Sequence, residues 1–176
     1  MTQRLSVRRA TLDDLDVVVE LRLALLREYG DHPFYGALRD DADARARDFF
    51  GMQILAPREA IYLARRGDRA IGIMRLAETV GSPLLEPERY CYVSSVYVRP
   101  EERRRGVLHA MMAEAERWCG EHGLTEMRLH NSSTSSTAQG AWSALGFEVV
   151  EEVRRRAVAA PSSRAQSRRR SHAEAY

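Results

Sequence analysis

Three adjacent arginines, Arg103, Arg104 and Arg105, stand directly before Gly106 and a stretch whose apolar residues follow helical spacing. The first turn of a helix carries backbone N–H groups without intrahelical partners, and together with the helix dipole they favour a bound anion. Arginine side chains add positive charge, and a glycine lets the backbone approach a ligand closely. The segment can therefore hold a pyrophosphate. The same residues are also typical of a solvated surface turn or a nucleic-acid contact, so other features must separate these interpretations.

The charge distribution argues against a nucleic-acid-binding domain. The 176-residue chain has a formal net charge of +2, and all 27 of its basic residues are arginine. Residues 154–176 contain seven arginines and one glutamate, so residues 1–153 carry a net charge of −4. A mildly acidic folded part does not fit a nucleic-acid surface. The absence of lysine also excludes a P-loop lysine and a Schiff-base lysine.

The remaining composition predicts a cytoplasmic globular protein. Cys91 and Cys119 are too few for a disulfide framework and lack metal-ligand spacing, so we expect no metal. No apolar run approaches the eighteen residues that a membrane span needs, and the N-terminal residues lack the apolar core of a secretory signal. We therefore expect no membrane association.

Hydrophobic periodicity predicts an α/β (α+β) fold in which a mixed, mostly antiparallel sheet is flanked by helices. The expected order is β-α-α-β-β-β-α-β-α-β, within a single domain over residues 1–156 and a disordered arginine-rich tail over 157–176. Thr11 and Asp14 resemble a capping box, and Gly67 suits a hairpin turn. The expected strands cover about 6–10, 60–66, 69–79, 89–99, 125–131 and 147–153, and the expected helices about 12–30, 40–55, 106–122 and 137–145.

The segment "VYVRPEERRRGVL" resembles motif A of the GNAT superfamily of acyl-CoA N-acyltransferases, whose signature is Arg/Gln-x-x-Gly-x-Gly/Ala. That signature falls on Arg103–Leu108. The resemblance covers nearly the whole chain, from the "VRRATLDDLDVVVELR" opening through the hairpin to "AQGAWSALGFEVVEE", which is similar to motif B. It implies a three-layer fold with a V-shaped splay between the fourth and fifth strands.

The resemblance implies that acetyl-CoA is the co-substrate and lies in this opening. Main-chain groups of the fourth strand would pair with the pantetheine arm, and the amides after it would hold the pyrophosphate. A bulge near Ser94 and Ser95 would expose an amide that polarises the thioester carbonyl. The implied contacts are Val96, Tyr97, Val98, Arg103, Arg104, Arg105, Gly106, Val107, Leu108, Asn131 and Trp142.

Three positions depart from the GNAT pattern. Leu108 replaces the small residue that ends motif A. Trp142 stands where motif B usually has the tyrosine that protonates the leaving thiolate, and an indole cannot do this at neutral pH. Tyr92 stands where some relatives have a carboxylate base. The acid–base candidates are therefore Tyr92, Glu88 and His130, with Glu78 as a further acid near the acceptor. Each also has a purely structural interpretation, and positioning alone could suffice for a neutral amine.

In this family the first two helices and the loop between them line the acceptor site. His32, Phe34 and Tyr35 are therefore acceptor-pocket candidates, and the acidic residues nearby indicate a cationic amine. The first hypothesis is an N-acetyltransferase acting on a primary amine, either of a small molecule or of a protein N-terminus or lysine. The second is an acyl-CoA-binding domain with weak catalysis, and the third is nucleic-acid association through the arginine runs. Homodimers are common in the family, so a homodimer is expected.

Overall fold

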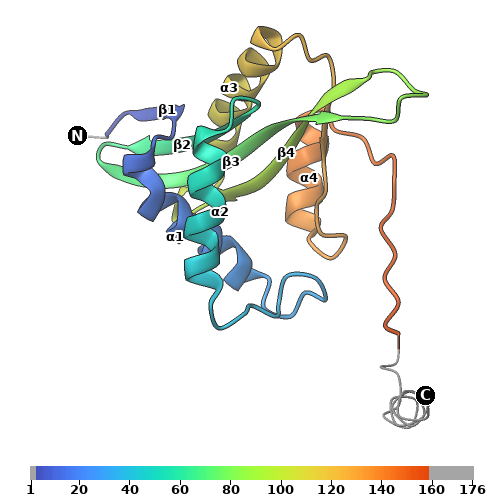
Figure 1. Cartoon of the computed structure of the whole chain (residues 1–176). Helices are drawn as coiled ribbons and strands as arrows, with labels where there is room; N and C mark the ends of the chain where they lie inside the picture. Colours follow the sequence, from blue (N-terminus) through green and yellow to red (C-terminus); the bar gives the residue numbers. More distant parts are fainter. Residues whose placement is uncertain (1–2, 159–176) are drawn as a thin grey trace, which may run out of the picture. The chain divides into compact units, whose positions relative to one another are not determined.

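The computed structural model describes residues 3–158, and those residues form a unit up to Gln139 and a second unit from Gly140. The predicted disordered tail therefore lies outside the described residues, apart from positions 157 and 158. Figure 1 shows the elements. The strands are β1 (Leu5–Arg9), β2 (Glu59–Arg66), β3 (Arg69–Val80), β4 (Arg89–Val98) and β5 (Met127–Leu129). The helices are η1 (Leu12–Asp14), α1 (Leu15–Glu28), α2 (Ala42–Leu55), η2 (Pro100–Glu102), α3 (Val107–Glu121) and α4 (Ser136–Ala144).

The five strands form one sheet in the order β1-β2-β3-β4-β5. The first three pairings are antiparallel and the β4–β5 pairing is parallel, which confirms the predicted mixed sheet. Gly67 provides the turn between β2 and β3 at φ 59°, a left-handed conformation that glycine adopts without strain. The parallel pairing requires a crossover, and α3 supplies it.

Helices cover both faces of the sheet. Alternate residues of a strand point to opposite faces, and on β2 Ile61 and Leu63 pack in one buried cluster with Val18 of α1 and Phe50 of α2. The other face is covered by α3, whose buried side chains include Met111 and Trp118. Figure 1 shows α1 and α2 together on one side of the sheet and α3 on the other. This arrangement confirms the three layers.

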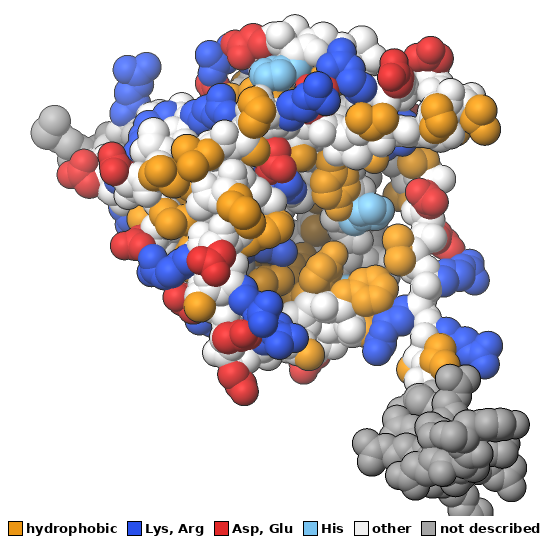
Figure 2. Space-filling view, in the orientation of Figure 1, with side chains coloured by type: hydrophobic (Ala, Val, Ile, Leu, Met, Phe, Trp, Pro, Cys, Tyr) orange, Lys and Arg blue, Asp and Glu red, His pale blue; other side chains and the backbone are white. Residues whose placement is uncertain are grey.

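The β3–β4 hairpin is long and ends in an apolar tip. Residues 81–88 connect the strands, and the Gly81 N–H donates to the Glu88 carbonyl at 2.8 Å. Leu84 and Leu85 at this tip are exposed, as is Val80 at the end of β3. Figure 2 shows apolar side chains gathered at the tip, at the upper right of the view.

The predicted strand over residues 147–153 is wrong, because the structure gives these residues no regular secondary structure. Their valines, Val149, Val150 and Val153, are exposed. β-branched residues favour a strand only where a neighbouring strand supplies hydrogen bonds and packing. Among residues 3–158 no strand pairs with this segment, so its β propensity stays unused.

A buried carboxylate, Asp14, joins the start of α1 to the edge of the sheet. Arg8 on β1 donates two hydrogen bonds to its two oxygens, both at 2.7 Å, and the Thr11 N–H donates at 2.9 Å. The Thr11–Asp14 bond confirms the predicted capping box. These bonds, with that from Arg8 first, lower the pKa of Asp14 to about 2. The ionised carboxylate therefore stabilises the folded state.

We predict that Asp14→Asn lowers the free energy of unfolding by about 2 kcal/mol at pH 7, since each unit of pKa shift corresponds to about 1.4 kcal/mol. A depressed pKa stabilises above the unfolded value, so the contribution is full above about pH 4 and disappears as the pH falls toward 2. Urea denaturation across this range measures the effect, with the exposed Asp13→Asn as the control. Equal unfolding free energies for Asp14→Asn and wild type at pH 7 would contradict the prediction.

Candidate functional site

A β-bulge interrupts β4 in its middle. Arg75 of β3 pairs with Ser94 and Ile73 pairs with Tyr97, so one residue of β3 faces two residues of β4, Ser95 and Val96. Ser95 has φ 53°, a left-handed conformation uncommon for a serine. A bulge releases backbone groups from the ladder and changes the strand's direction. The structure thus confirms the bulge that the resemblance to the GNAT superfamily implied near Ser94 and Ser95.

The bulge coincides with the point where β4 and β5 separate. β5 pairs only with Cys91–Val93, whereas β4 continues to Val98. Over residues 94–98, the edge of β4 that faces away from β3 has no strand partner within the part of the chain that the structure describes. An unpaired edge presents backbone N–H and C=O groups that an extended ligand can bind as an added strand.

The helix start beyond β4 presents free amides. Gly106 has φ 78° and caps α3, and Arg104 before it has φ 60°. The first backbone bond of the helix runs from the Ala110 N–H to the Gly106 carbonyl at 3.0 Å. The amides of Val107 and Leu108 precede it and have no acceptor among residues 3–158. Such groups at a helix N-terminus form a site for a phosphate group.

Two of the three adjacent arginines are already paired. The Arg103 Nη2 donates to both carboxylate oxygens of Glu28 on α1, each at 2.7 Å. The Arg105 Nη1 donates to the buried carboxylate of Glu102 at 3.3 Å. Arg104 is exposed and forms no ion pair with any residue from 3 to 158. The site for an anion is therefore formed mainly by the backbone, and Arg103 and Arg105 hold the loop in shape.

Leu108 follows the core side of α3. It precedes Met111 by three residues and Ala115 by seven, and both of these are buried. Side chains at this spacing share a helix face, which places Leu108, half-buried, on the flank of the core. Its backbone amide still lies in the first turn, while its side chain belongs with the packed face.

Tyr92 and His130 form a hydrogen-bonded pair at the open end of the parallel pairing. The Tyr92 hydroxyl and the His130 Nδ1 lie 2.8 Å apart, and the ring centroids are 5.6 Å apart. Burial raises the pKa of Tyr92, with smaller contributions from Tyr35 and Tyr90. The hydroxyl therefore stays protonated at neutral pH and can donate. The structure brings together two of the three predicted acid–base residues.

The two predicted glutamates lie elsewhere. Glu78 is paired with Cys91, whose neighbour Tyr92 points to the other face of the sheet, so Glu78 and Tyr92 lie on opposite faces. The Arg89 side chain donates to Glu78 at 2.7 Å and lowers its pKa. Glu88 is exposed in the hairpin loop before β4 and has no hydrogen bond to Tyr92. The register of β3 against β4 and the alternation of side chains along a strand therefore separate Glu78 from Tyr92 and His130.

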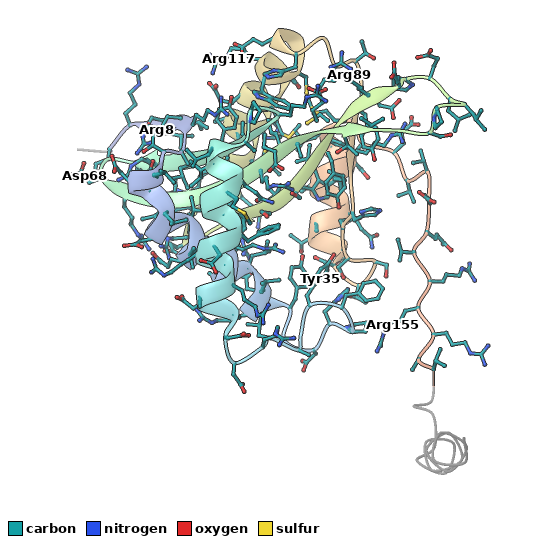
Figure 3. The ribbon with its side chains drawn as sticks, viewed as in Figure 1. Arg8, Tyr35, Asp68, Arg89, Arg117 and Arg155 are labelled. Carbon is teal, nitrogen blue, oxygen red and sulfur yellow. The ribbon has the colours of Figure 1, made fainter. Side chains whose placement is uncertain are left out.

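The three aromatic acceptor candidates gather in the loop after α1. His32 and Tyr35 stack with centroids 4.6 Å apart, and His32 and Phe34 lie 5.9 Å apart. The Phe34 N–H donates to the His32 Nδ1 at 3.1 Å, which leaves the ring proton on Nε2. Figure 3 shows Tyr35 in this loop between α1 and α2. Tyr35 also contributes to the raised pKa of Tyr92.

A sequence model described as the acetyltransferase (GNAT) family matches residues 21–147, most of the chain. The chain belongs to the GNAT acetyltransferase family. It is 34% identical over 62 residues to an aminoglycoside N(6')-acetyltransferase type 1 of Salmonella typhimurium, spanning 35% of this chain but only 43% of that relative. It is 26% identical over 107 residues to a protein of the same name from Klebsiella aerogenes, spanning 61% of this chain and 70% of that one.

The fold is also shared with solved GNAT structures. One is that of AAC(6')-Iy in complex with the bisubstrate analogue CoA-S-monomethyl-acetylneamine. The TM-score is 0.71 at 23% identity, and the match covers 89% of this chain and 99% of that one. At this identity the likeness shows the fold alone. The match to the family model, together with the shared fold, confirms the resemblance that the "RRRGVL" segment suggested.

The remaining predicted GNAT contacts are placed as follows. Tyr97 is buried against the α1 side of the core, so only its backbone faces the open edge. Asn131 is exposed just after β5. Trp142 belongs to the second unit and packs edge-on against Phe147, with centroids 5.3 Å apart. Contact of these residues with a ligand stays a prediction.

Two functional candidates escaped the sequence analysis. Arg75 on β3 donates to Glu59 at 2.8 Å and to the Ser94 hydroxyl at 3.1 Å, which supports the strand beside the bulge. Arg22 on α1 lies near Tyr35 and Tyr92. The helical spacing of apolar residues could have identified Arg22, since it is the charged residue on a face of α1 that is otherwise apolar.

We predict that Gly106→Ala weakens acetyl-CoA binding about five- to tenfold, because a side chain at positive φ costs roughly 1–2 kcal/mol and relaxes the amides out of line. Leu108→Ala is the matched comparison and is expected to change the dissociation constant less than about threefold while lowering the unfolding free energy by about 1 kcal/mol. Isothermal titration and urea denaturation measure both. Equal losses of affinity in the two variants would show that the Leu108 side chain itself contacts the ligand.

Proposed function

We propose that this chain is an N-acetyltransferase that moves an acetyl group from acetyl-CoA to a primary amine of a small molecule, by direct attack in a ternary complex. One observation carries the proposal: the open, bulged edge of β4 leads directly to the free amides at the start of α3, with Tyr92 and His130 beside it. Membership of the GNAT acetyltransferase family supports it.

The residues present fit a CoA thioester. The amides of Val107 and Leu108, with Gly106 in its left-handed conformation, offer donors to a pyrophosphate. The edge of β4 over 94–98 offers alternating donors and acceptors to the amides of a pantetheine arm. Both parts occur in order along one strand–loop–helix unit, as the extended shape of CoA requires. The relative solved with a CoA-containing analogue supports this assignment.

The bulge supplies the electrophilic group in this proposal. Ser95 and Val96 are left out of the ladder to β3, and we assign the Val96 N–H to the thioester oxygen. Negative charge develops on that oxygen as the amine attacks. A fixed backbone donor stabilises such charge without reorganisation at the moment of reaction.

Tyr92 and His130 handle the protons in this proposal. Acetyl transfer from a thioester to a neutral amine yields an amide and a thiol, so one proton leaves the nitrogen and one reaches the sulfur. Tyr92, protonated at neutral pH, donates to the sulfur, and the amine proton returns to the pair through His130. Trp142 cannot take the donor role, because an indole N–H does not ionise at neutral pH.

The acceptor class rests on the aromatic loop and the relatives. His32, Phe34 and Tyr35 pack against one another and form an aromatic wall that can contact the apolar part of a small molecule. Two relatives named aminoglycoside N(6')-acetyltransferase support a small-molecule amine as acceptor. No helix within residues 3–158 is long and apolar enough to cross a membrane. A cytoplasmic location and a homodimer stay predictions.

The direct test combines isothermal titration with a thiol-release assay. Acetyl-CoA is expected to bind at micromolar to submillimolar concentration, the usual range for enzyme substrates. A panel of primary amines is then scored by mass spectrometry for the acetylated amine. Failure to bind at millimolar acetyl-CoA would contradict the proposal, whereas binding without amine-dependent thiol release and without any acetylated amine would favour the acyl-CoA-binding alternative.

We predict that Tyr92→Phe lowers kcat about a hundredfold with little change in acetyl-CoA affinity, since a positioned general acid contributes roughly 10²–10⁴-fold. His130→Ala is expected to lower kcat as well, and the double variant to lose no more than the larger single loss, because the two residues act as a pair. Tyr90→Phe is the matched control, two residues away on the same face of β4. Additive losses in the double variant would show that the residues act separately.

A further inference from the structure

Arg22 lies on the sheet-facing side of α1. It follows Val18 by four residues and Val19 by three, and both valines are fully buried. Residues at this spacing share one face of a helix. The Arg22 side chain is half-buried. Arg75 pairs with Ile61, whose side chain packs with α1, and Tyr92 lies on the same face of the sheet because it pairs with Ala77, two residues after Arg75. The electrostatic influence of Tyr35, Arg75 and Tyr92 on the pKa of Arg22 agrees with this placement. A permanently charged group therefore reaches the acceptor side of the acid–base pair.

Among residues 3–158 Arg22 has no carboxylate partner and no side-chain hydrogen bond. This sets it apart from the arginines around it: Arg75 pairs with Glu59 at 2.8 Å, and Arg103 pairs with Glu28 at 2.7 Å. Burial without a partner lowers the pKa of Arg22, but a guanidinium stays charged at any physiological pH. Without a protein partner, the half-buried guanidinium is open to an anionic ligand, which would replace the water around it.

Part of the acidic charge of the neighbouring segment, residues 31–48, is taken up by arginines of the same segment. Asp41 accepts from Arg45 at 2.7 Å, and Asp43 accepts from Arg47 at 3.2 Å. Figure 2 shows acidic and basic side chains interspersed over this part of the molecule rather than a single acidic patch. The expectation of a cationic acceptor rested on counting these acids, and the pairing of two of the five aspartates with arginines removes part of its basis.

We propose that the acceptor amine carries a carboxylate, which Arg22 binds while the amine faces Tyr92 and His130. The substrate class is that of amino acids and short peptides with a free carboxylate, and a polycationic aminoglycoside is disfavoured. A guanidinium matches a carboxylate with two parallel hydrogen bonds, which fixes the orientation of the amine as well as adding affinity. The aromatic wall of His32, Phe34 and Tyr35 then contacts the remaining part of the acceptor. This inference rests on the proposed acetyltransferase function.

The test compares matched acceptors: the twenty common L-amino acids and a set of dipeptides, each against its C-terminal amide, together with kanamycin. For the wild-type protein we expect kcat/KM to favour the carboxylate of each active pair about ten- to a hundredfold, the loss expected when a charged hydrogen bond is removed. Arg22→Gln is expected to bring this ratio within about threefold of one, and Arg22→Lys to retain part of it. Arg27→Gln, an exposed arginine on the same helix, is the control and should leave the ratio unchanged.

Acetyl-CoA affinity, measured separately by isothermal titration, distinguishes the possible failures. A wild-type preference for the amides or for kanamycin would overturn the carboxylate inference and leave the acetyltransferase function standing. Loss of acetyl-CoA affinity in Arg22→Gln, with folding intact by circular dichroism, would assign Arg22 to the CoA site and also overturn it. Absence of acetyl-CoA binding in the wild type would overturn the proposed function itself.

Discussion

The separation of β4 from β5 after Val93 is the constraint on which the candidate site depends. Up to that point the parallel pairing holds the two strands together, and beyond it the bulge at Ser95 and Val96 carries β4 away. The separation exposes the β4 backbone, and it brings His130 at the end of β5 against Tyr92. A longer β5 would pair with the edge and close the opening. A short fifth strand and one extra residue in the fourth strand therefore create the opening between β4 and β5.

Arginine pairs keep the surroundings of this opening in place. Arg103 ties the loop before α3 to the end of α1 through Glu28, and Arg75 ties β3 to the bulge through Ser94. Surface ion pairs contribute little to stability on their own. Their role here is to hold neighbouring elements in position. The pairing of Arg103 with Glu28 also leaves its charge less available to an anion than the backbone amides are. Arg22 differs from these arginines because it has no carboxylate partner among residues 3–158, and the proposal assigns its charge to a ligand carboxylate.

In the proposed site, the CoA side and the acceptor side are built from different kinds of chemical group. The proposed CoA side is formed mainly by backbone groups, which most sequences can supply once the bulge and the helix start are in place. The acceptor side is formed by side chains from α1, the following loop and the sheet. The proposed carboxylate specificity accordingly rests on a side chain, Arg22.

The strand–loop–helix unit and the hairpin at Gly67 could be predicted from the sequence, because each depends on residues close together in the chain. The family followed from an ordered series of motifs along nearly the whole chain, and the bulge was implied by that resemblance. The sequence also predicted a strand over 147–153, which the structure lacks, since a strand needs a partner that local propensity cannot supply. Only the tertiary structure decided that Tyr92 meets His130, that Glu78 faces away, and that Arg22 stands without a carboxylate. These outcomes depend on which faces distant strands and helices present to one another. Spacing along one segment does not contain that information.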